Sequence, residues 1–573
     1  MYKAIVGLEV HVELNTKSKM FCSCRNNPNA RIPNSEICPI CLGHPGTLPV
    51  INKEAVRKTI KTGLALNCQI PEYSKFDRKN YFYPDLPKGY QISQLYMPFC
   101  KTGFLEIDNK KIRIREIHLE EDVGRLIHEK DCSLVDFNRA GIPLMELVTE
   151  PDLNSAKEAR KFAEELQLIL RYLNVSGADM EKGEMRVEVN ISLAQGSKRK
   201  AQKLGTKVEI KNLNSFRAVE KSIDYEIKRQ EKILKSGKKV IQETRGWLDE
   251  ATASSRRVAG ARVDDVKGVT VSQREKEFAH DYRYFPEPDL PILHLGTPEY
   301  LNGIKAEIPE LPQQKRKRLR REYELDEKSI ELFVFNKDFG EYFEKVVSEF
   351  DPRLPHTKIF NLIKLATNYL ITDLQGLLKG AQVSGEDFLI TPEDFAQFIT
   401  LIHDGKISSK IAKQVLSGMF KTGADPSHII EEQGLIQITD TATIEKIVKE
   451  IISKNQKAIK ELKKLIKKRF LKWLKPRTRI NSVRGKQGLI EEVKRLHRSG
   501  ISWKKIEDFG IHYRIIAKYL QKELNYQEMI ENSLKELQNY AKRQMTWFKR
   551  DERIHWVKNQ KEAEKLVKEF LPS

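Results

Sequence analysis

No stretch of this 573-residue sequence is apolar for long enough to cross a membrane, which takes roughly 18 to 20 residues. The first residues do not fit a secretion signal, because Glu9, His11 and Glu13 stand where such a signal has its apolar core. Internal repeats and low-complexity segments are also missing. A hydrophobic content of 40% with 32% charged residues excludes wholesale disorder. We therefore expect a folded cytoplasmic protein of three or four domains, at about 150 residues each.

The sequence also lacks the two common nucleotide-binding loops. Neither a Gly-x-x-x-x-Gly-Lys-Ser/Thr motif nor a dinucleotide fingerprint is present. If the protein binds ATP, the predicted strands have to hold the nucleotide instead.

Basic residues outnumber acidic ones by 101 to 80, and the resulting charge of +21 suggests an anionic partner. The excess is unevenly distributed. Residues 461–573 hold 29 basic and 14 acidic side chains, whereas residues 1–460 hold 72 and 66. Four of the five tryptophans lie within residues 461–573, while all seven cysteines lie at or before Cys132. The chain therefore joins at least two pieces of different composition.

The hydrophobic pattern changes along the chain. Residues 1 to about 290 show the alternation of period two that predicts strands, interrupted by a helical stretch at 155–173. Six prolines between 286 and 312 mark a boundary, because proline ends helices and central strands. Beyond it the chain reads as helical, with Thr391 and Ser408 as predicted N-caps. We place the domains at 1–292, 293–390, 391–460 and 461–573.

Four cysteines have the spacing of a zinc site. Cys22-x-Cys24 is followed after thirteen residues by Cys38-x-x-Cys41, and two thiol pairs on turns can surround Zn²⁺ tetrahedrally. Free thiols and disulfides are the alternatives, and a cytoplasmic location disfavours disulfides. We therefore predict a structural Zn²⁺, and we interpret the other three cysteines as packing residues.

Four predicted strands carry acidic or polar side chains on one face. These are Glu9, His11 and Glu13; His118 and Glu120; Glu188 and Asn190; and Glu209. An antiparallel sheet with one solvated face explains each of them singly. However, an ordinary solvated face favours Thr, Lys and Ser. The pattern therefore also suggests a sheet surface rich in side-chain oxygens, which could bind divalent cations for phosphoryl chemistry.

Two further segments, 75–85 and 280–289, combine cations, aromatic residues and a turn. Each is either a turn that packs in the core or a site where Arg and Lys hold phosphate beside a ring that stacks on a base.

Long motifs in matching order run through residues 1–460: Ile5–Leu14, Phe76–Asp85, Tyr90–Gln94, His118–Asp122, Val208–Phe216 and Asp281–Asp289. Together they resemble the B subunits of the aspartyl/glutamyl-tRNA amidotransferases. The resemblance implies an α+β fold, with an antiparallel-sheet cradle similar to glutamine synthetase followed by all-helical domains. It also implies an enzyme, a ligase that uses ATP to phosphorylate the side chain of Glu or Asp esterified to a mischarged tRNA. Ammonia then displaces the phosphate.

The resemblance assigns roles to particular residues. The candidates for holding metal or substrate are Glu9, His11, Glu120, Glu121, Glu150, Glu188, Asn190 and Glu209, of which Glu9, His11, Glu120 and Glu209 are the Mg²⁺ candidates. Lys79 and Arg283 are the candidate phosphate partners of ATP. Two positions depart from the family pattern, since Glu188 replaces the usual Asp and His44 replaces an apolar residue.

The sequence contains no amidase-type nucleophile segment that could release ammonia from glutamine. The resemblance implies that two partner chains of the same enzyme supply this function, namely the glutaminase, called the A subunit, and the small C subunit. We therefore expect the chain alone to be unable to use glutamine. The alternative function is a non-catalytic scaffold that binds tRNA.

The resemblance ends near residue 461, where a basic helical stretch begins. Residues 487–496 and 541–556 instead resemble the C-terminal part of tRNA dimethylallyltransferases, over about 480–560. Prenyl transfer is not expected, because the phosphate loop and catalytic residues of that enzyme lie in a part that is absent here. Cations interleaved with aromatic residues predict RNA contacts by Lys542, Arg543, Trp547, Lys549 and Arg550. A solvated basic helix and an accidental fusion are the alternatives.

Overall fold

The structure is a computed structural model that describes residues 2–195, 205–249, 268–275, 282–380, 383, 385, 388–435 and 489–548. The chain divides into two compact units, residues 1–436 and 437–573. Each unit is described by itself.

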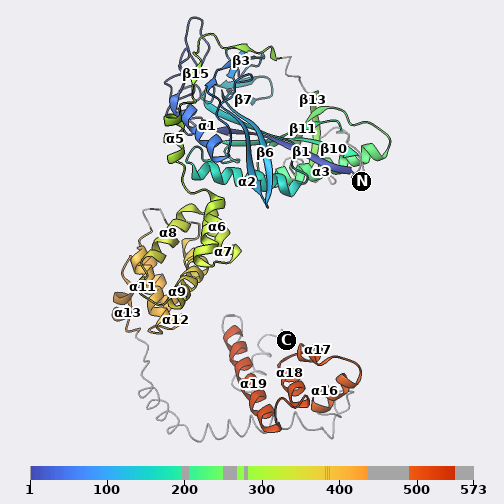
Figure 1. Ribbon diagram of the computed structural model, residues 1–573, viewed down its shortest axis with the longest axis vertical. Coiled ribbons are helices and arrows are strands. Elements are labelled where there is room, and N and C mark those ends of the chain that lie inside the picture. Colours follow the sequence, from blue (N-terminus) through green and yellow to red (C-terminus); the bar gives the residue numbers. More distant parts are fainter. Residues whose placement is uncertain are drawn as a thin grey trace, which may run out of the picture. The chain divides into compact units, whose positions relative to one another are not determined.

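An eight-stranded sheet forms the centre of the first unit (Figure 1). Its strands, in spatial order, are β13 (Val269–Glu275), β12 (Glu243–Leu248), β11 (Val208–Leu213), β10 (Met185–Gln195), β1 (Tyr2–Glu13), β9 (Pro143–Thr149), β6 (Lys110–Glu121) and β5 (Cys100–Ile107). Neighbouring strands are antiparallel except β11 and β12, which are parallel. The sheet is therefore mixed, and the prediction of a wholly antiparallel sheet is wrong at this one pair.

The alternation in the sequence places the apolar side chains on one face of the sheet. Val6, Leu8 and Val10 of β1 are buried there. Helices α1 (Lys53–Ala65), α2 (Ala156–Tyr172) and α3 (Phe216–Lys235) cover this face. Ser155 and Ser215 cap α2 and α3 by accepting backbone hydrogen bonds, which confirms the helix predicted at 155–173. The opposite face remains for the polar side chains.

Short strands stand beside the main sheet. β3 (Asp77–Asn80) pairs with β4 (Tyr90–Ser93) and with β14 (Phe285–Pro286), so the two segments rich in cations and aromatic residues lie side by side. β2 (Tyr73–Ser74) pairs with β15 (Leu293–His294), and β7 (Arg125–His128) forms a hairpin with β8 (Ser133–Asp136).

The rest of the first unit is helical, as predicted. Its helices are α5 (Pro298–Ala306), α6 (Pro312–Tyr323), α7 (Glu327–Phe335), α8 (Lys337–Ser348), α9 (His356–Tyr369), the π-helix Leu370–Leu374, α10 (Gln375–Leu378), α11 (Pro392–His403), α12 (Ser409–Thr422) and α13 (Pro426–Glu432). Thr391 and Ser408 cap α11 and α12, which confirms both predicted N-caps. Arg316 joins the helices to the sheet domain, since its guanidinium contacts Glu165 of α2 and Glu331 of α7, each at 2.8 Å.

The second unit has a small core of its own. Its described helices are α16 (Leu489–Arg498), α17 (Trp503–Glu507), α18 (Ile511–Leu520) and α19 (Tyr526–Phe548). Val493, Ile506, Ile516 and Met529 are buried in this core. Throughout the described parts of both units, no helix combines the length and apolar character needed to span a membrane.

Candidate active site and metal centres

Strand register brings the predicted acids together on the open face of the sheet. Glu9 of β1 stands opposite Glu188 of β10, and Asn190 of β10 stands opposite Glu209 of β11. Along the opposite edge of β1, where this strand pairs with β9, His11 stands opposite Glu146. Because side chains alternate along each strand, these pairs all project to the same side.

The first group, here called the imidazole cluster, consists of His11, His118, Glu120 and Glu146. Glu146 Oε2 lies 3.3 Å from His11 Nε2 and 3.1 Å from His118 Nε2. Glu120 faces the same two rings at 4.0 and 3.7 Å. The hydroxyl of Ser93 donates to Glu120 Oε2 at 2.8 Å and so fixes this carboxylate. His11, Glu120 and Glu146 each offer a ligand atom within 4.8 Å of the other two, which is a separation that one metal ion can bridge.

Mutual attraction sets the protonation of this cluster. Burial lowers the pKa of His118, but the carboxylates of Glu146 and Glu120 outweigh burial and raise it to about 10. The pKa of His11 is raised in the same way, mainly by Glu146 against burial. Burial raises the pKa of Glu146, and the two rings then lower it well below its ordinary value. Without a metal ion the cluster therefore holds ionised carboxylates and protonated rings, and a bound cation would have to displace the proton of any ring that ligates it.

The second group, here called the carboxylate cluster, consists of Glu9, Glu188 and Glu209. Each contributes an oxygen within 4.8 Å of the other two. Asn190 donates to Glu9 at 2.7 Å, Lys211 contacts Glu188 at 2.9 Å, and the hydroxyl of Thr244 donates to Glu209 at 2.6 Å. Carboxylate oxygens are the ligands that Mg²⁺ prefers, so the donor set fits a hard divalent cation.

Lys79 faces the imidazole cluster. Burial lowers its pKa, but the carboxylates of Glu120 and Glu146 are among the groups that raise it overall. Its ammonium lies 5.0 Å from the centre of the Tyr282 ring, within cation–π range. Arg283 has a φ of +46° and points elsewhere, with its guanidinium 5.9 Å from the centre of the exposed Phe82 ring. Lys79 and Arg283, the two predicted phosphate partners, thus lie on neighbouring segments of backbone, but their side chains have different surroundings.

Two predicted residues lie outside both clusters. Glu121 follows Glu120 and so projects to the other side of β6, where it forms an ion pair with Lys88 and accepts the backbone N–H of Ile92 at 2.9 Å. Glu150 lies just beyond the end of β9, and the groups of metal-ligating side chains found among the described residues do not include it.

Sequence reasoning missed Glu146, which contacts both histidines. It stands in the segment Pro143–Thr149, whose apolar residues resemble a fully buried strand, so one acid within it gives little signal. The strand pattern places His118 on a polar face but assigns it no role. Ser93 and Thr244 give no signal in a single sequence, because their contacts depend on pairing between distant strands.

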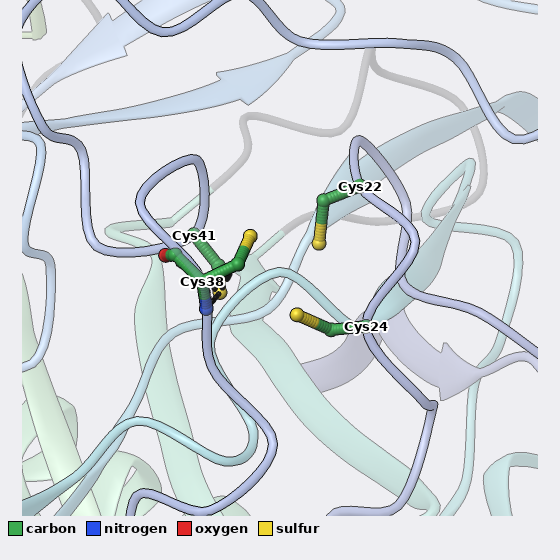
Figure 2. Close-up of side chains that lie close together, drawn as sticks. All are labelled: Cys22, Cys24, Cys38 and Cys41. Carbon is green, nitrogen blue, oxygen red and sulfur yellow. Dashed lines mark hydrogen bonds between the residues drawn. The ribbon is translucent and has the colours of Figure 1, made fainter.

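The four predicted zinc ligands converge. Figure 2 shows Cys22 and Cys24 on one loop pointing toward Cys38 and Cys41 on another. All four sulfur atoms lie within 4.8 Å of one another. The hydrogen bond with Cys22, together with the backbone N–H of Cys38, lowers the pKa of the Cys41 thiol to about 5, against burial, which raises it. Four converging thiols that include an acidic one are the donor set that Zn²⁺ selects.

The predicted RNA contacts in the tail are not defined structurally. The backbone of Lys542, Arg543 and Trp547 lies in α19, but their side chains fall outside the described residues, and so do Lys549 and Arg550.

Three family models match the chain. One described as the GatB/GatE catalytic domain matches residues 4–301, which span the sheet domain with both clusters. One described as the GatB domain matches residues 341–475, and one described as IPP transferase matches residues 415–551. The last match confirms the second resemblance in the tail.

Curated relatives agree with the first two models. The B subunit of the aspartyl/glutamyl-tRNA(Asn/Gln) amidotransferase of Thermotoga petrophila is 46% identical over 472 residues, which cover 81% of this chain and 92% of the relative. The corresponding protein of Caldicellulosiruptor saccharolyticus is also 46% identical, with the same coverage. That of Dehalococcoides mccartyi is 45% identical over 473 residues, 80% of this chain and 91% of the relative.

The sheet domain and its acidic face thus define a catalytic domain of the tRNA-dependent amidotransferase class, whose enzymes are ligases. The chain belongs to the family of B subunits of aspartyl/glutamyl-tRNA(Asn/Gln) amidotransferases.

Proposed function

We propose that this chain phosphorylates the side-chain carboxylate of Glu or Asp esterified to tRNA, and then amidates it with ammonia. The observation that carries the proposal is the pair of clusters on one sheet face, together with Lys79, which faces the imidazole cluster. We further propose that the sheet domain is a cradle of the glutamine synthetase type.

The reaction requires activation because a carboxylate is a poor electrophile. In the first step a carboxylate oxygen attacks the γ-phosphorus of ATP, ADP leaves, and an acyl phosphate forms. In the second step ammonia attacks the acyl carbon, phosphate leaves, and the amide nitrogen loses a proton. Transfer from ATP needs positive charge around the phosphate oxygens.

The clusters fit the cations that such a transfer uses. Glu9, Glu188 and Glu209 would hold Mg²⁺ through oxygen alone, and bound Mg²⁺ neutralises phosphate charge. The imidazole cluster offers nitrogen as well as oxygen, and imidazole suits ions such as Fe²⁺ and Zn²⁺ better than Mg²⁺. We therefore propose the carboxylate cluster as the main Mg²⁺ site.

The protein's own cations supply the rest of the charge. Lys79 is close enough to Glu120 and Glu146 for these acids to raise its pKa, so it stays protonated at the reaction site. Arg283 stands over an exposed ring at the edge of β14 and β3, which suits contact with the outer part of ATP. Both roles are consistent with the absence of a phosphate loop from the sequence.

Ammonia has to come from a partner. We propose that a glutaminase, as the A subunit, and a small C subunit assemble with this chain, since the sequence contains no amidase nucleophile and the matched relatives are called B subunits. We also propose that Cys22, Cys24, Cys38 and Cys41 hold a structural Zn²⁺, which their convergence supports.

The tail is proposed to add RNA contacts through Lys542, Arg543, Trp547, Lys549 and Arg550. The match of residues 415–551 to the IPP transferase model supports this role. The alternative of a non-catalytic scaffold is not favoured, because both clusters are assembled in the catalytic domain.

The decisive test combines the chain with its partner subunits, mischarged tRNA, Mg²⁺, ATP and ammonium. The wild type is expected to form Gln-tRNA(Gln) or Asn-tRNA(Asn), whereas Glu9→Gln and Glu209→Gln should abolish product and keep tRNA affinity. Glu54→Gln, at an exposed position of α1, is the control for carboxylate loss elsewhere. Unaltered turnover in both cluster variants would reject the proposed role of the clusters.

A further inference from the structure

Lys19 is a lysine without any accessible surface, beside the four cysteines. We call residues 18–52, which carry these cysteines, the cysteine module. The backbone N–H of Lys19 donates to the carbonyl of Cys24 at 2.9 Å, so this residue forms the base of the first cysteine turn. Its ammonium donates to the carbonyl of Phe137 at 3.2 Å.

That environment does not compensate a buried positive charge. Across the parts of the chain that the structure describes, no carboxylate lies within ion-pair distance of Lys19 Nζ, and the Phe137 carbonyl is its hydrogen-bond acceptor. Burying an ammonium against a neutral carbonyl is strongly unfavourable, because the lost hydration is not repaid. A nearby negative charge would offset this cost and keep the buried amine protonated.

The cysteine sulfur atoms are the groups that can provide it. A Cβ placed on Gly141 would lie 3.5 Å from Lys19 Cδ and 3.6 Å from Cys41 Cβ, so the two side chains border the same glycine.

We propose that Lys19 is the counter-charge of a four-thiolate zinc centre. Four thiolates around Zn²⁺ carry a net charge of −2, of which Lys19 would offset one unit. The inference rests on the proposed zinc site and extends it to a residue that does not ligate the metal. It accounts for the buried Lys19 ammonium and for the excess negative charge of the four thiolates together, since each charge is the partner of the other.

A counter-charge makes a prediction that a packing residue does not. With zinc bound, Lys19→Met removes the offsetting charge and weakens metal binding. Without zinc the four sulfur atoms carry less negative charge than four thiolates, so the same substitution removes a charge that is less fully offset and keeps the aliphatic chain. The variant should then melt at the same temperature as the metal-free wild type, or higher.

The test uses the full-length chain, with zinc per chain measured by metal analysis and affinity measured by competition with a colorimetric chelator. Lys19→Met should lower zinc affinity about tenfold or more, as expected for outer groups of a metal site. Lys19→Arg keeps the charge and should stay within about threefold of wild type. Lys17→Met, at an exposed position two residues away, is the control and should leave affinity unchanged. Melting with and without a chelator completes the comparison.

Each outcome discriminates. Equal zinc affinity in wild type and Lys19→Met overturns the proposed role of Lys19 as counter-charge but leaves the zinc site standing. A Lys19→Met variant that loses as much stability without zinc as with it indicates a packing role and also overturns it. If Lys19→Met does not fold, Lys19→Gln decides, because it removes the charge and keeps a hydrogen-bond donor for the Phe137 carbonyl. Zinc affinity equal to that of the wild type in Lys19→Gln would overturn the counter-charge. A wild type that binds no zinc overturns the zinc site and the counter-charge together.

Discussion

Thr244 offers a sharp test of the carboxylate cluster, because it contacts the cluster without belonging to it. Thr244 stands opposite Glu209 across the parallel pair of β11 and β12, and its hydroxyl donates to Glu209 Oε2 at 2.6 Å. Both side chains are buried. The hydroxyl thus fixes one oxygen of a carboxylate that lies within 4.8 Å of Glu9 and Glu188. Thr244→Val removes this hydrogen bond and keeps the shape of the side chain.

The expected size follows from the charge of the acceptor. A hydrogen bond to a charged group contributes about 1.5–3 kcal/mol, which corresponds to a tenfold change or more in an equilibrium constant. Outer groups of metal sites typically change metal affinity about 10- to 100-fold. We therefore expect Thr244→Val to raise the Mg²⁺ concentration for half-maximal amidation about tenfold or more.

The assay is ammonium-dependent amidation by the assembled enzyme, with Mg²⁺ varied at saturating ATP and tRNA. The rate at saturating Mg²⁺ should fall by about threefold or less, since the group acts through Glu209, and tRNA affinity should be unchanged. Thr244→Ser restores the hydroxyl and should restore the Mg²⁺ dependence. Thr270→Val is the matched control, because Thr270 is also a buried threonine of this sheet but contacts Glu226 and Arg245 instead.

Two results would refute the reasoning. Unchanged Mg²⁺ dependence in Thr244→Val would show that Glu209 does not need this hydrogen bond to bind the cation. Equal defects in Thr244→Val and Thr244→Ser would show that packing, and not the hydroxyl, determines the effect.

Three further predictions concern the other parts of the chain. Glu146→Gln should reduce amidation about 10- to 100-fold, because Glu146 contacts both His11 and His118, and turnover near wild type would exclude the imidazole cluster from the reaction. The purified chain alone should release no glutamate from glutamine, and glutaminase activity in that preparation would contradict the need for a partner. Truncation after residue 460 should weaken tRNA binding and flatten its salt dependence, whereas an unchanged slope in a filter-binding titration would remove the tail from the RNA interface.

Local periodicity was sufficient to predict one side of the site. The alternation in β1 and β10 correctly placed Glu9, Glu188 and Asn190 on the polar face, because side-chain direction in a strand depends only on position. The same rule separates Glu120 from Glu121, since adjacent residues project to opposite sides. The prediction that placed Glu120 and Glu121 in one site relied on their adjacency in a motif and did not apply this rule.

Long-range pairing determined the rest. Glu146 joins the histidines because β9 lies between β1 and β6, and nothing local to Pro143–Thr149 reveals those neighbours. The parallel pairing of β11 with β12, which places Thr244 beside Glu209, was likewise not predictable from either strand alone. The helices of the first unit were easier to predict, because an N-cap such as Thr391 contacts a backbone N–H only three residues away in the sequence.

The basic excess of residues 461–573 is unevenly distributed along the sequence. Residues 489–540, which include most of the described helices of the second unit, hold nine basic and eight acidic side chains. The basic excess lies on either side, with eleven basic against one acidic residue in 461–488 and nine against five in 541–573. Because attraction to phosphate depends on the number of cations near it, residues 489–540 by themselves are poor candidates for an RNA surface. The five proposed contacts lie in the flanking segment 541–573. We therefore expect any RNA contact of the tail to come from residues 541–573 and not from the nearly neutral residues 489–540, and the overall charge of +21 describes neither segment.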